Sequence, residues 1–373
     1  MRVHGMKRFS LLLTVLVTAG LAWADSPPAT APAAIEVFAK LREGPGNLTV
    51  TPDGRVIVSL HQFFETSLRV ALVESDGKLT PFPNAEWNTP GLDGRYSFDS
   101  VLGIQCDQRG VVWMLDNGLR GKSTPKLVGW DLGENRLVKV IPLPPPVTRP
   151  DSFVNDLAVD RAHDRIYIAD PAGERSALIV VDIETGDARR VLEGHPSVVP
   201  ENVDMVIDGR PLEMLQDGKA VRPRVGVNPI ALDAADQWLY FGPMSGTSLY
   251  RARTSDLGDA SLPAMALAQR VERYAQRPVS DGISVDGDGN IYISAVADHA
   301  IGVIGPDQQY RVLVRDEQYL SWPDAFSLGP NGWMYVVANQ LHKTAPLNGG
   351  TKEARAPYYV LRFRALAPGV VGR

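Results

Sequence analysis

The stretch from Asp281 to Ser294, DGISVDGDGNIYIS, contains the pattern that decides the fold. A short alternating run leads into a turn of Asp, Gly and Asn, and a second run rich in β-branched and aromatic residues follows, which predicts a β-hairpin. Five other segments repeat the pattern: LTVTPDGRVIVSL from Leu48, LGIQCDQRGVVWMLD from Leu102, NDLAVDRAHDRIYIAD from Asn155, NPIALDAADQWLYFG from Asn228 and DAFSLGPNGWMYVVAN from Asp324. Six similar hairpins indicate an internal structural repeat.

The spacing of the hairpins matches the size of a propeller blade. They align on one turn residue each: Asp53, Asp107, Asp160, Asp233, Asp286 and Gly329. Further strand-like runs, such as KLVGWDL and SALIVVDI, lie between the hairpins and would supply a third and a fourth strand. The sequence therefore predicts an all-β fold, a six-bladed β-propeller with four-stranded blades around a central channel.

Small side chains recur two positions before the turn residue in five of the six hairpins, and Gln105 takes this position in the other. The small residues are Thr51, Ala158, Ala231, Ser284 and Ser327. Innermost strands crowd around the axis of a propeller, so small residues suit this position. Strand-like runs at 35–41 and 358–364 stand at the two ends of the repeats, and we expect one of them to help close the ring, because closure removes exposed edges.

Residues 1–24 have the features of a secretory signal peptide. Three basic residues precede an apolar run of about 14 residues that ends in Ala-Trp-Ala, with cleavage expected near Ala24. A membrane span needs roughly 20 apolar residues, so an uncleaved anchor is the less favoured alternative. Residues 25–34 read as a Pro/Ala-rich tether and residues 35–373 as the propeller. We expect a secreted protein, periplasmic in a bacterium.

Composition excludes several classes of partner and of site. The net charge is −5 without basic runs, so the chain lacks the electrostatic footprint of a protein that binds nucleic acid or a membrane surface. Cys106 is the only cysteine, which excludes disulfides, CxxC redox pairs and Cys-rich zinc sites. We expect a monomer whose partner is a small molecule. An insertion at about 195–225 is predicted to form a partial lid or a decoration.

Four successive hairpins begin with a short oxygen-bearing side chain, at Asn155, Asn228, Asp281 and Asp324. The repeat places these residues at one mouth of the channel, where they could hold a small polar ligand or a divalent cation such as Ca²⁺. No other cofactor is predicted. The alternative is that these side chains only bond to the backbone where each strand begins.

The second strands of the hairpins end on the same face with further polar residues. These residues include His61, Asp170 and Asn339. Imidazole and carboxylate groups suit general acid–base chemistry, whereas the alternative role of a strand-end Asp is to cap a turn. We therefore take His61, Asp170 and Asp324 as candidate catalytic residues and Asn155, Asn228, Asp281 and Asn339 as candidate ligand-binding residues.

Several blocks resemble the yellow / major royal jelly protein family in its bacterial, dopachrome-tautomerase-related branch. They are TPFPNAEWN from Thr80, DSVLGIQCDQRGVVWMLDNG from Asp99 and NPIALDAADQWLYFGPMSGTSLYRARTSDL from Asn228. The resemblance implies a secreted six-bladed propeller, and it covers dopachrome-converting, amine-binding and nutrient proteins. VANQL places Asn339 where amine-binding members have a channel contact. The implied activity is binding and isomerisation of a small polar or aromatic molecule, with His61 or Asp170 as base and Asn side chains stabilising an oxyanion.

A more distant resemblance is to the SMP-30/gluconolactonase propellers. It rests on the tripeptides Glu43-Gly44-Pro45, Val154-Asn155-Asp156 and Ser280-Asp281-Gly282. This resemblance implies a divalent metal held by Glu43, Asn155 and Asp281, which would polarise a lactone carbonyl and activate water. A metal-dependent lactonase and a binding protein without turnover thus remain the alternatives to a tautomerase.

Overall fold

The computed structural model describes residues 1, 34–89, 91 and 95–373. Nearly all of the predicted signal peptide and tether therefore lies outside the described residues. Within the described part of the chain, no helix has both the length and the apolar character needed to cross a bilayer.

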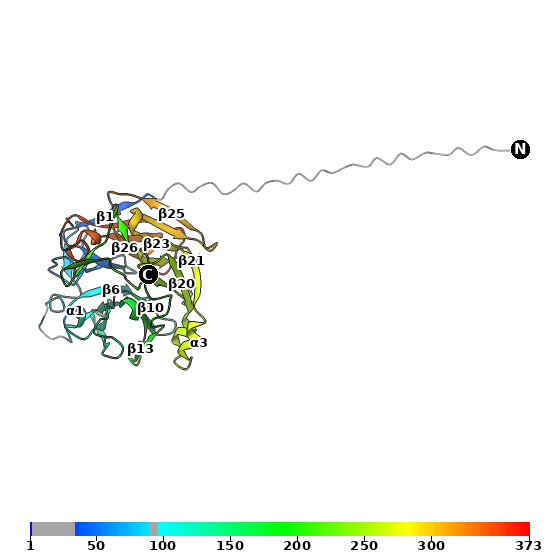
Figure 1. Cartoon of the computed structure of the whole chain (residues 1–373), viewed down its shortest axis with the longest axis horizontal. Helices are drawn as coiled ribbons and strands as arrows, with labels where there is room; N and C mark the ends of the chain where they lie inside the picture. The colour runs from blue at the N-terminus through cyan, green and yellow to red at the C-terminus, as the bar shows by residue number, and fades with distance from the viewer. Residues whose placement is uncertain (2–33, 90, 92–94) are drawn as a thin grey trace. The chain divides into compact units, whose positions relative to one another are not determined.

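Six four-stranded antiparallel sheets form a six-bladed β-propeller, which confirms the predicted fold (Figure 1). The first three blades, each from its innermost strand outward, are β2 (Pro45–Val50), β3 (Val56–Leu60), β4 (Val70–Val73) and β5 (Leu79–Pro81); β6 (Val101–Cys106), β7 (Val111–Asp116), β8 (Lys126–Asp131) and β9 (Arg136–Pro142); and β10 (Leu157–Asp160), β11 (Arg165–Asp170), β12 (Ala177–Asp182) and β13 (Ala188–Val191). The next two are β18 (Val227–Leu232), β19 (Trp238–Pro243), β20 (Ser248–Arg253) and β21 (Glu272–Gln276); and β22 (Ser280–Val285), β23 (Ile291–Ala295), β24 (Ala300–Ile304) and β25 (Tyr310–Arg315).

The sixth blade is assembled from both ends of the repeat region. It contains β26 (Pro323–Leu328), β27 (Trp333–Ala338), β28 (Tyr358–Arg364) and, as its outermost strand, β1 (Glu36–Leu41). β1 pairs antiparallel with β28, so the N-terminal run closes the ring, as expected from the two flanking strand patterns. Each innermost strand contacts the innermost strand of the next blade, and β2 contacts β26, which completes the circle.

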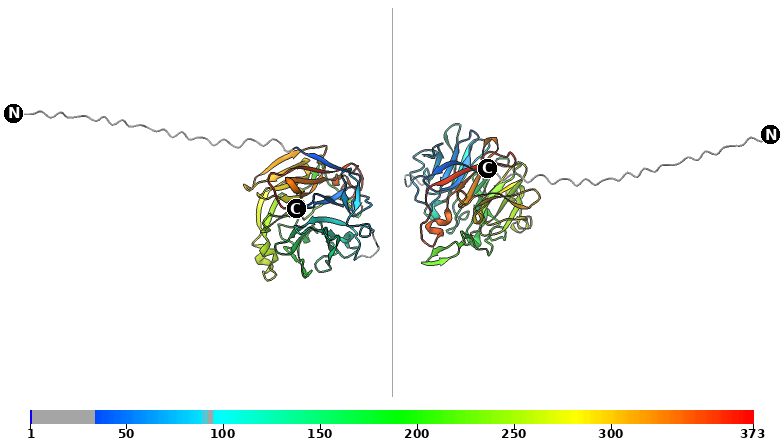
Figure 2. Two further views of the ribbon diagram at one scale, coloured as in Figure 1. Left: turned by 180° about the vertical axis from the view of Figure 1, so that it is seen from behind. Right: turned by 90° about the horizontal axis from the view of Figure 1, so that it is seen from above.

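Short helices and two small hairpins decorate the loops. They are α1 (Gly118–Gly121), η1 (Gly173–Arg175), α2 (Thr254–Gly258), α3 (Ala264–Ala268), η2 (Val296–Asp298), η3 (Pro330–Gly332), η4 (Leu341–Lys343), η5 (Ala345–Leu347), and the hairpins of β14 (Val206–Ile207) with β15 (Arg210–Pro211) and of β16 (Met214–Gln216) with β17 (Lys219–Val221). The two hairpins belong to the insertion and project from one face of the ring (Figure 2).

The turn residues that aligned the repeats have a local structural role. The Asp107 carboxylate accepts hydrogen bonds from the backbone N–H groups of Arg109 (2.8 Å) and Val111 (3.0 Å). Asp286 accepts in the same way from Asp288 and Asn290. A short acceptor at this position satisfies the N–H groups of the turn, which explains why it recurs.

Hydrogen bonds between innermost strands link neighbouring blades around the axis. The Ser327 hydroxyl accepts from the Val50 N–H (3.0 Å), and the Gln105 side-chain oxygen accepts from the Val159 N–H (2.7 Å). Gln105 departs from the small-residue pattern but makes the same kind of link between blades as Ser327. Burial raises the pKa of the neighbouring Cys106 thiol to about 12, which leaves it unreactive.

The C-terminal residues lie at the centre of the ring (Figure 1). There the Arg373 guanidinium donates to the backbone carbonyls of Asp233 (2.8 Å) and Val159 (3.1 Å) and forms an ion pair with Asp236. Asp233 is a turn residue of the aligned hairpins, so this contact lies at the turn end of the channel. A ligand site on the axis is therefore expected at the opposite end.

Candidate functional site

A cavity of about 660 Å³ lies at the end of the channel where the innermost strands begin. Polar residues at the starts of the innermost strands form its floor: Asn47, Asn155, Asp156, Asn228, Asp281 and Asp324. Its walls are mainly apolar and include Phe63, Leu102, Phe153, Met205, Leu212, Met214, Met244, Trp322, Leu341 and Leu347. An apolar cavity with a few converging polar groups is the usual form of a small-molecule site.

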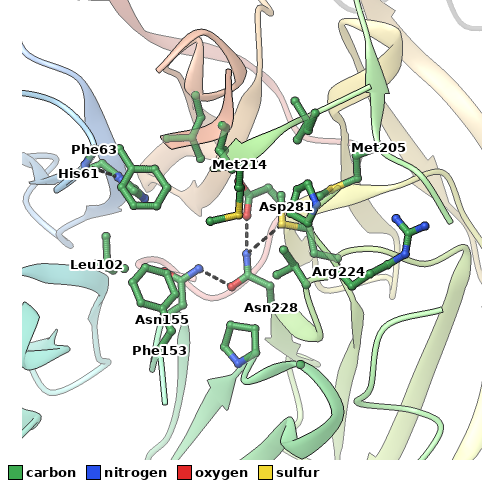
Figure 3. Close-up of a pocket in the computed structure, with 18 of the residues that line it drawn as sticks. His61, Phe63, Leu102, Phe153, Asn155, Met205, Met214, Arg224, Asn228 and Asp281 are labelled. Carbon is green, nitrogen blue, oxygen red and sulfur yellow. Dashed lines mark hydrogen bonds between the residues drawn. The ribbon is translucent and has the colours of Figure 1, made fainter. Parts of the chain in front are cut away.

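Three of the predicted ligand-binding residues form a hydrogen-bonded chain across the floor (Figure 3). The Asn155 side-chain amide donates to the Asn228 oxygen, and the Asn228 amide donates to one oxygen of Asp281. The indole N–H of Trp322 donates to the other Asp281 oxygen at 2.7 Å. The structure thus brings together the oxygen-bearing residues that start successive hairpins, and Asp324 lines the same cavity.

Asn339 lies behind this floor. Its side-chain amide donates to Asp324 (2.8 Å) and to the backbone carbonyl of Pro45 (3.0 Å), and it does not line the cavity. It therefore positions Asp324 and joins the last blade to the first. Its predicted direct contact with a ligand is not supported by this geometry.

Two floor residues were not predicted. Asn47 donates to an Asp156 oxygen at 2.9 Å, so the pair links the first and third blades across the channel. The turn of the first hairpin begins at Thr51, whose N–H pairs with the Arg55 carbonyl as the Asp107 N–H pairs with the Val111 carbonyl, so the sequence alignment on Asp53 was two residues out of register. In the corrected register Asn47 is equivalent to Asp156. The adjacent polar pair Asn155-Asp156 was the signal available in the sequence for Asp156.

Asp281, which is buried, and Asp324, which is half-buried, form a pair of carboxyl groups. Gly282 allows the approach of their strands, because a Cβ at this position would lie 2.4 Å from the Asp324 carbonyl oxygen. Burial raises the pKa of Asp281 to about 6 and, together with the charge of Asp281, raises the pKa of Asp324 well above its usual value. Two close carboxyl groups in a low-dielectric site share a proton, so the pair retains one near neutral pH.

Asp156 is a third acidic group on the floor with altered titration. Burial, opposed by the hydrogen bond from the Leu157 N–H and assisted by the Asp281 charge, raises the pKa of Asp156 to about 7. Between pH 4 and 7 the folded protein holds a proton that the unfolded chain has released, so this group lowers stability as the pH rises through that range.

We expect Asp156→Asn to stabilise the protein at pH 8, because the amide keeps an acceptor for Asn47 and carries no buried charge. The gain should be about 2 kcal/mol, since water in the cavity screens part of the effect, and it should vanish near pH 4. Urea denaturation of both proteins from pH 4 to pH 8 measures the difference. Parallel pH profiles for the variant and the wild type would contradict the raised pKa of Asp156.

His61 lines the cavity but does not suit the predicted role of base. The Phe63 N–H donates to its Nδ1 at 3.1 Å, which places the proton of the neutral ring on Nε2. Burial, with the nearby Arg120 charge, lowers the pKa of His61 to about 3, so the ring is neutral at physiological pH. His61 can donate a hydrogen bond from Nε2. Its assignment as a base is corrected to that of a donor.

Asp170 does not line the cavity, and its position does not support the predicted catalytic role. Its fully buried carboxylate accepts from the Ser152 hydroxyl (2.6 Å) and the Phe153 N–H (2.9 Å) and pairs with Arg190 (2.6 Å). Asp170 thus fixes the loop that carries Phe153 into the cavity. This outcome matches the alternative of a strand-end Asp that holds a turn.

The predicted metal ligands do not converge. The Glu43 carboxylate accepts from the backbone N–H and hydroxyl of Ser67, at 2.7 and 2.6 Å, and lies outside the cavity. Among the described residues, no cluster of three His, Cys, Asp or Glu side chains could hold a metal ion. The set of Glu43, Asn155 and Asp281 therefore does not fit a divalent cation.

We expect the melting temperature of the purified protein to be unchanged by EDTA and by added Ca²⁺, because no assembled ligand set links metal binding to folding. A thermal-shift titration in metal-free buffer, with each addition made to the same preparation, measures the response. A Ca²⁺-dependent rise in melting temperature that EDTA reverses would contradict the conclusion that these residues do not form a metal site.

The insertion forms one side of the cavity, as expected for a segment that partly covers a site. Met205, Leu212 and Met214 from its hairpins line the cavity, and their side faces Phe63 and Phe153 in Figure 3. Its first hairpin is fixed to the last two blades by the Asp208 carboxylate. Asp208 pairs with Nε2 of His299 (2.7 Å) and of His342 (3.1 Å) and with Lys343 (3.4 Å).

Comparisons with solved structures support the fold. A gluconolactonase from Xanthomonas campestris superposes with a TM-score of 0.56 at 11% identity, and the match covers 89% of each chain. A luciferin-regenerating enzyme superposes with a TM-score of 0.56 at 12% identity and covers 91% of this chain and all of the other. At such low identity these similarities concern the fold alone.

Sequence comparisons identify the family. Major royal jelly protein 1 of Apis mellifera is 25% identical over 243 residues, which are 60% of this chain and 52% of the relative. Major royal jelly protein 6 of the same species is 28% identical over 185 residues, which are 46% of this chain and 39% of the relative. The chain thus matches about half the length of these relatives or less. The major royal jelly protein family model matches residues 99–369, and the chain therefore belongs to the major royal jelly protein family.

Proposed function

We propose that this protein binds a small polar or aromatic molecule in the axial cavity and isomerises it by proton transfer, in a reaction like that of a dopachrome tautomerase. The observation that carries the proposal is the Asp281–Asp324 pair, which lies on the floor of an apolar cavity and whose pKa values are both raised. A carboxyl pair that shares one proton supplies an acid and a base side by side near neutral pH.

The chemistry requires no cofactor. Ionised Asp281 would take a proton from one carbon or heteroatom of the ligand, and protonated Asp324 would deliver one to another position. A proton exchanged between the two carboxyls restores the starting state, so neither atoms nor electrons are gained or lost. The pair lies within one hydrogen-bonded network with Asn228 and Trp322, which fixes the orientation of Asp281.

His61 complements this pair. Its free Nε2–H group can donate to an oxygen that gains negative charge as the proton leaves the ligand. Because the ring is neutral, it would act as a fixed donor and would not compete with Asp281 for the proton. A ligand that fills the space between the apolar walls would displace water from the cavity, which would strengthen such a hydrogen bond.

The proposal also covers the cellular location and the oligomeric state of the protein. The basic and apolar pattern of residues 1–24 supports export, and we propose a secreted, periplasmic monomer that acts on a soluble ligand. The lactonase alternative is not retained as a proposal, because its ligand set is not assembled.

The test is the loss of dopachrome absorbance with purified protein, measured against the uncatalysed rate and against heat-denatured protein. We expect acceleration that is proportional to protein concentration. Quenching of the tryptophan fluorescence of the protein by dopachrome without faster conversion would overturn the catalytic half of the proposal and favour a binding protein. If dopachrome causes no quenching and is converted no faster, both the binding half and the catalytic half of the proposal are overturned.

A further inference from the structure

Arg120 is a cation at the cavity without a carboxylate partner among the described residues. It lines the cavity, and no ion pair or hydrogen bond joins it to the described part of the chain. The other arginines of the lining differ, because Arg222 and Arg224 both pair with Asp204. The Arg120 side chain is solvent-exposed, so its guanidinium is hydrated and can exchange that water for an anionic group on a ligand.

The backbone that carries Arg120 is strained. Leu119 and Arg120 have φ values of 49° and 55°, and Gly118 and Gly121 on either side also have positive φ. Side-chain-bearing residues rarely adopt this left-handed conformation, and each costs about 1–2 kcal/mol. Strain that persists at a cavity wall is typical of a functional site. The turn is held in place by Asn117, whose side-chain oxygen accepts from the Leu119 N–H at 2.9 Å.

Two phenyl rings define the surface on which Arg120 rests. The rings of Phe63 and Phe153 are inclined by 14° with their centroids 6.4 Å apart, and the Arg120 guanidinium carbon lies 5.8 and 4.4 Å from those centroids. Both rings are on the side of the cavity opposite Met205 and Arg224 (Figure 3). Cation–π contact keeps the guanidinium at this wall, and its N–H groups remain available to a ligand.

From these contacts we infer that Arg120 is the receptor for a carboxylate on the ligand, so that the preferred ligands are planar aromatic acids. The inference rests on the proposed function, because it names the class of substrate of the same site. The ring of the ligand would lie along Phe63 and Phe153 with its carboxylate on Arg120, and its far end would reach the Asp281–Asp324 floor. A planar guanidinium matches a carboxylate through two parallel hydrogen bonds.

The test uses two probes of nearly equal shape, indole-2-carboxylate and neutral indole-2-carboxamide, titrated by calorimetry. We expect the wild type to bind the carboxylate at least about tenfold more tightly, with a preference that weakens as salt is added. Arg120→Met should abolish the preference and leave the affinity for the carboxamide within about twofold, which also shows that the variant is folded.

Arg224→Met is the matched control. Arg224 also lines the cavity, but its guanidinium is already held by the Asp204 carboxylate at 2.6 Å, so this variant should keep the preference for the carboxylate. Equal binding of the two probes by the wild type, or a preference that survives in Arg120→Met, would overturn the inference and leave the proposed function standing. If the wild type binds neither probe, both the inference and the proposed class of ligand fail.

Discussion

Asp324→Asn is expected to lower the rate constant for dopachrome tautomerisation by about a hundredfold or more, because an amide cannot deliver a proton at this position. The amide oxygen still accepts from Asn339, so the last blade keeps its connection to the floor. Absorbance loss under single-turnover conditions measures the proton-transfer step, and calorimetry with a non-reacting aromatic acid measures binding separately. We expect the rate constant of the proton-transfer step to fall by about a hundredfold or more and the affinity for the aromatic acid to change little.

The pH profile provides an independent readout of the same pair. In the wild type the rate should rise as Asp281 ionises near pH 6 and fall when Asp324 loses its proton at higher pH. The two apparent pKa values belong to the pair and not to single residues. In Asp324→Asn the descending limb should disappear. The control is Asp298→Asn, which alters a carboxylate of the short helix η2 that does not line the cavity and should leave the profile unchanged. A variant at Asp324 with more than half of the wild-type rate would refute the proton relay.

The repeat pattern was sufficient to predict the fold and much of the floor. A blade recurs with one register, so residues at equal distances from the turn must point to the same end of the channel. This geometric requirement is why Asn155, Asn228 and Asp281 meet although more than 120 positions of sequence separate the first from the last. The small residues of the innermost strands indicated the axis for the same reason.

Residues whose placement depends on irregular backbone could not be predicted in this way. Arg120 enters the cavity through a left-handed turn, which does not follow the two-residue period of a strand. Asn47 was missed because the turn of the first hairpin begins at Thr51 and not at the aligned Asp53. Glu43 looked like a metal ligand because of its neighbours in sequence. Its side chain instead caps the loop at Ser67, and only the three-dimensional path of the chain shows this.

The repeat pattern also could not predict the protonation states and hydrogen-bond partners of the candidate acid and base residues. His61 has the right residue type and position for a base, but the Phe63 N–H occupies the nitrogen that would have to accept the proton. Asp170 and Asp116 end equivalent strands in adjacent blades. Each carboxylate accepts hydrogen bonds from the backbone of a loop and forms an ion pair with a buried cation. A strand-end carboxylate is therefore informative only once its partners are known.

Lys126→Met is expected to lower the free energy of unfolding by about 3–5 kcal/mol, because it leaves a buried carboxylate without its counter-charge. The Lys126 ammonium lies 2.8 Å from Asp116, and their side chains are 4% and 0% exposed. The Asp116 carboxylate also accepts from the backbone N–H groups of Asp99 and Ser100 at 2.9 and 3.0 Å. Urea denaturation at neutral pH measures the loss.

The double variant Asp116→Asn/Lys126→Met separates the buried charge from the lost packing. An amide is neutral and keeps an acceptor for the loop, so we expect the double variant to recover a large part of the lost stability. Asp116 also accepts from the Gly118 N–H at 3.0 Å, at the start of the left-handed turn that presents Arg120. Lys126→Met should therefore also weaken the preference for indole-2-carboxylate over indole-2-carboxamide, and the double variant should restore it in part. If Lys126→Met lowers the free energy of unfolding by less than about 1 kcal/mol, water or another cation compensates the charge of Asp116. In that case the stability of this loop does not depend on the residue pair that helps to place Arg120.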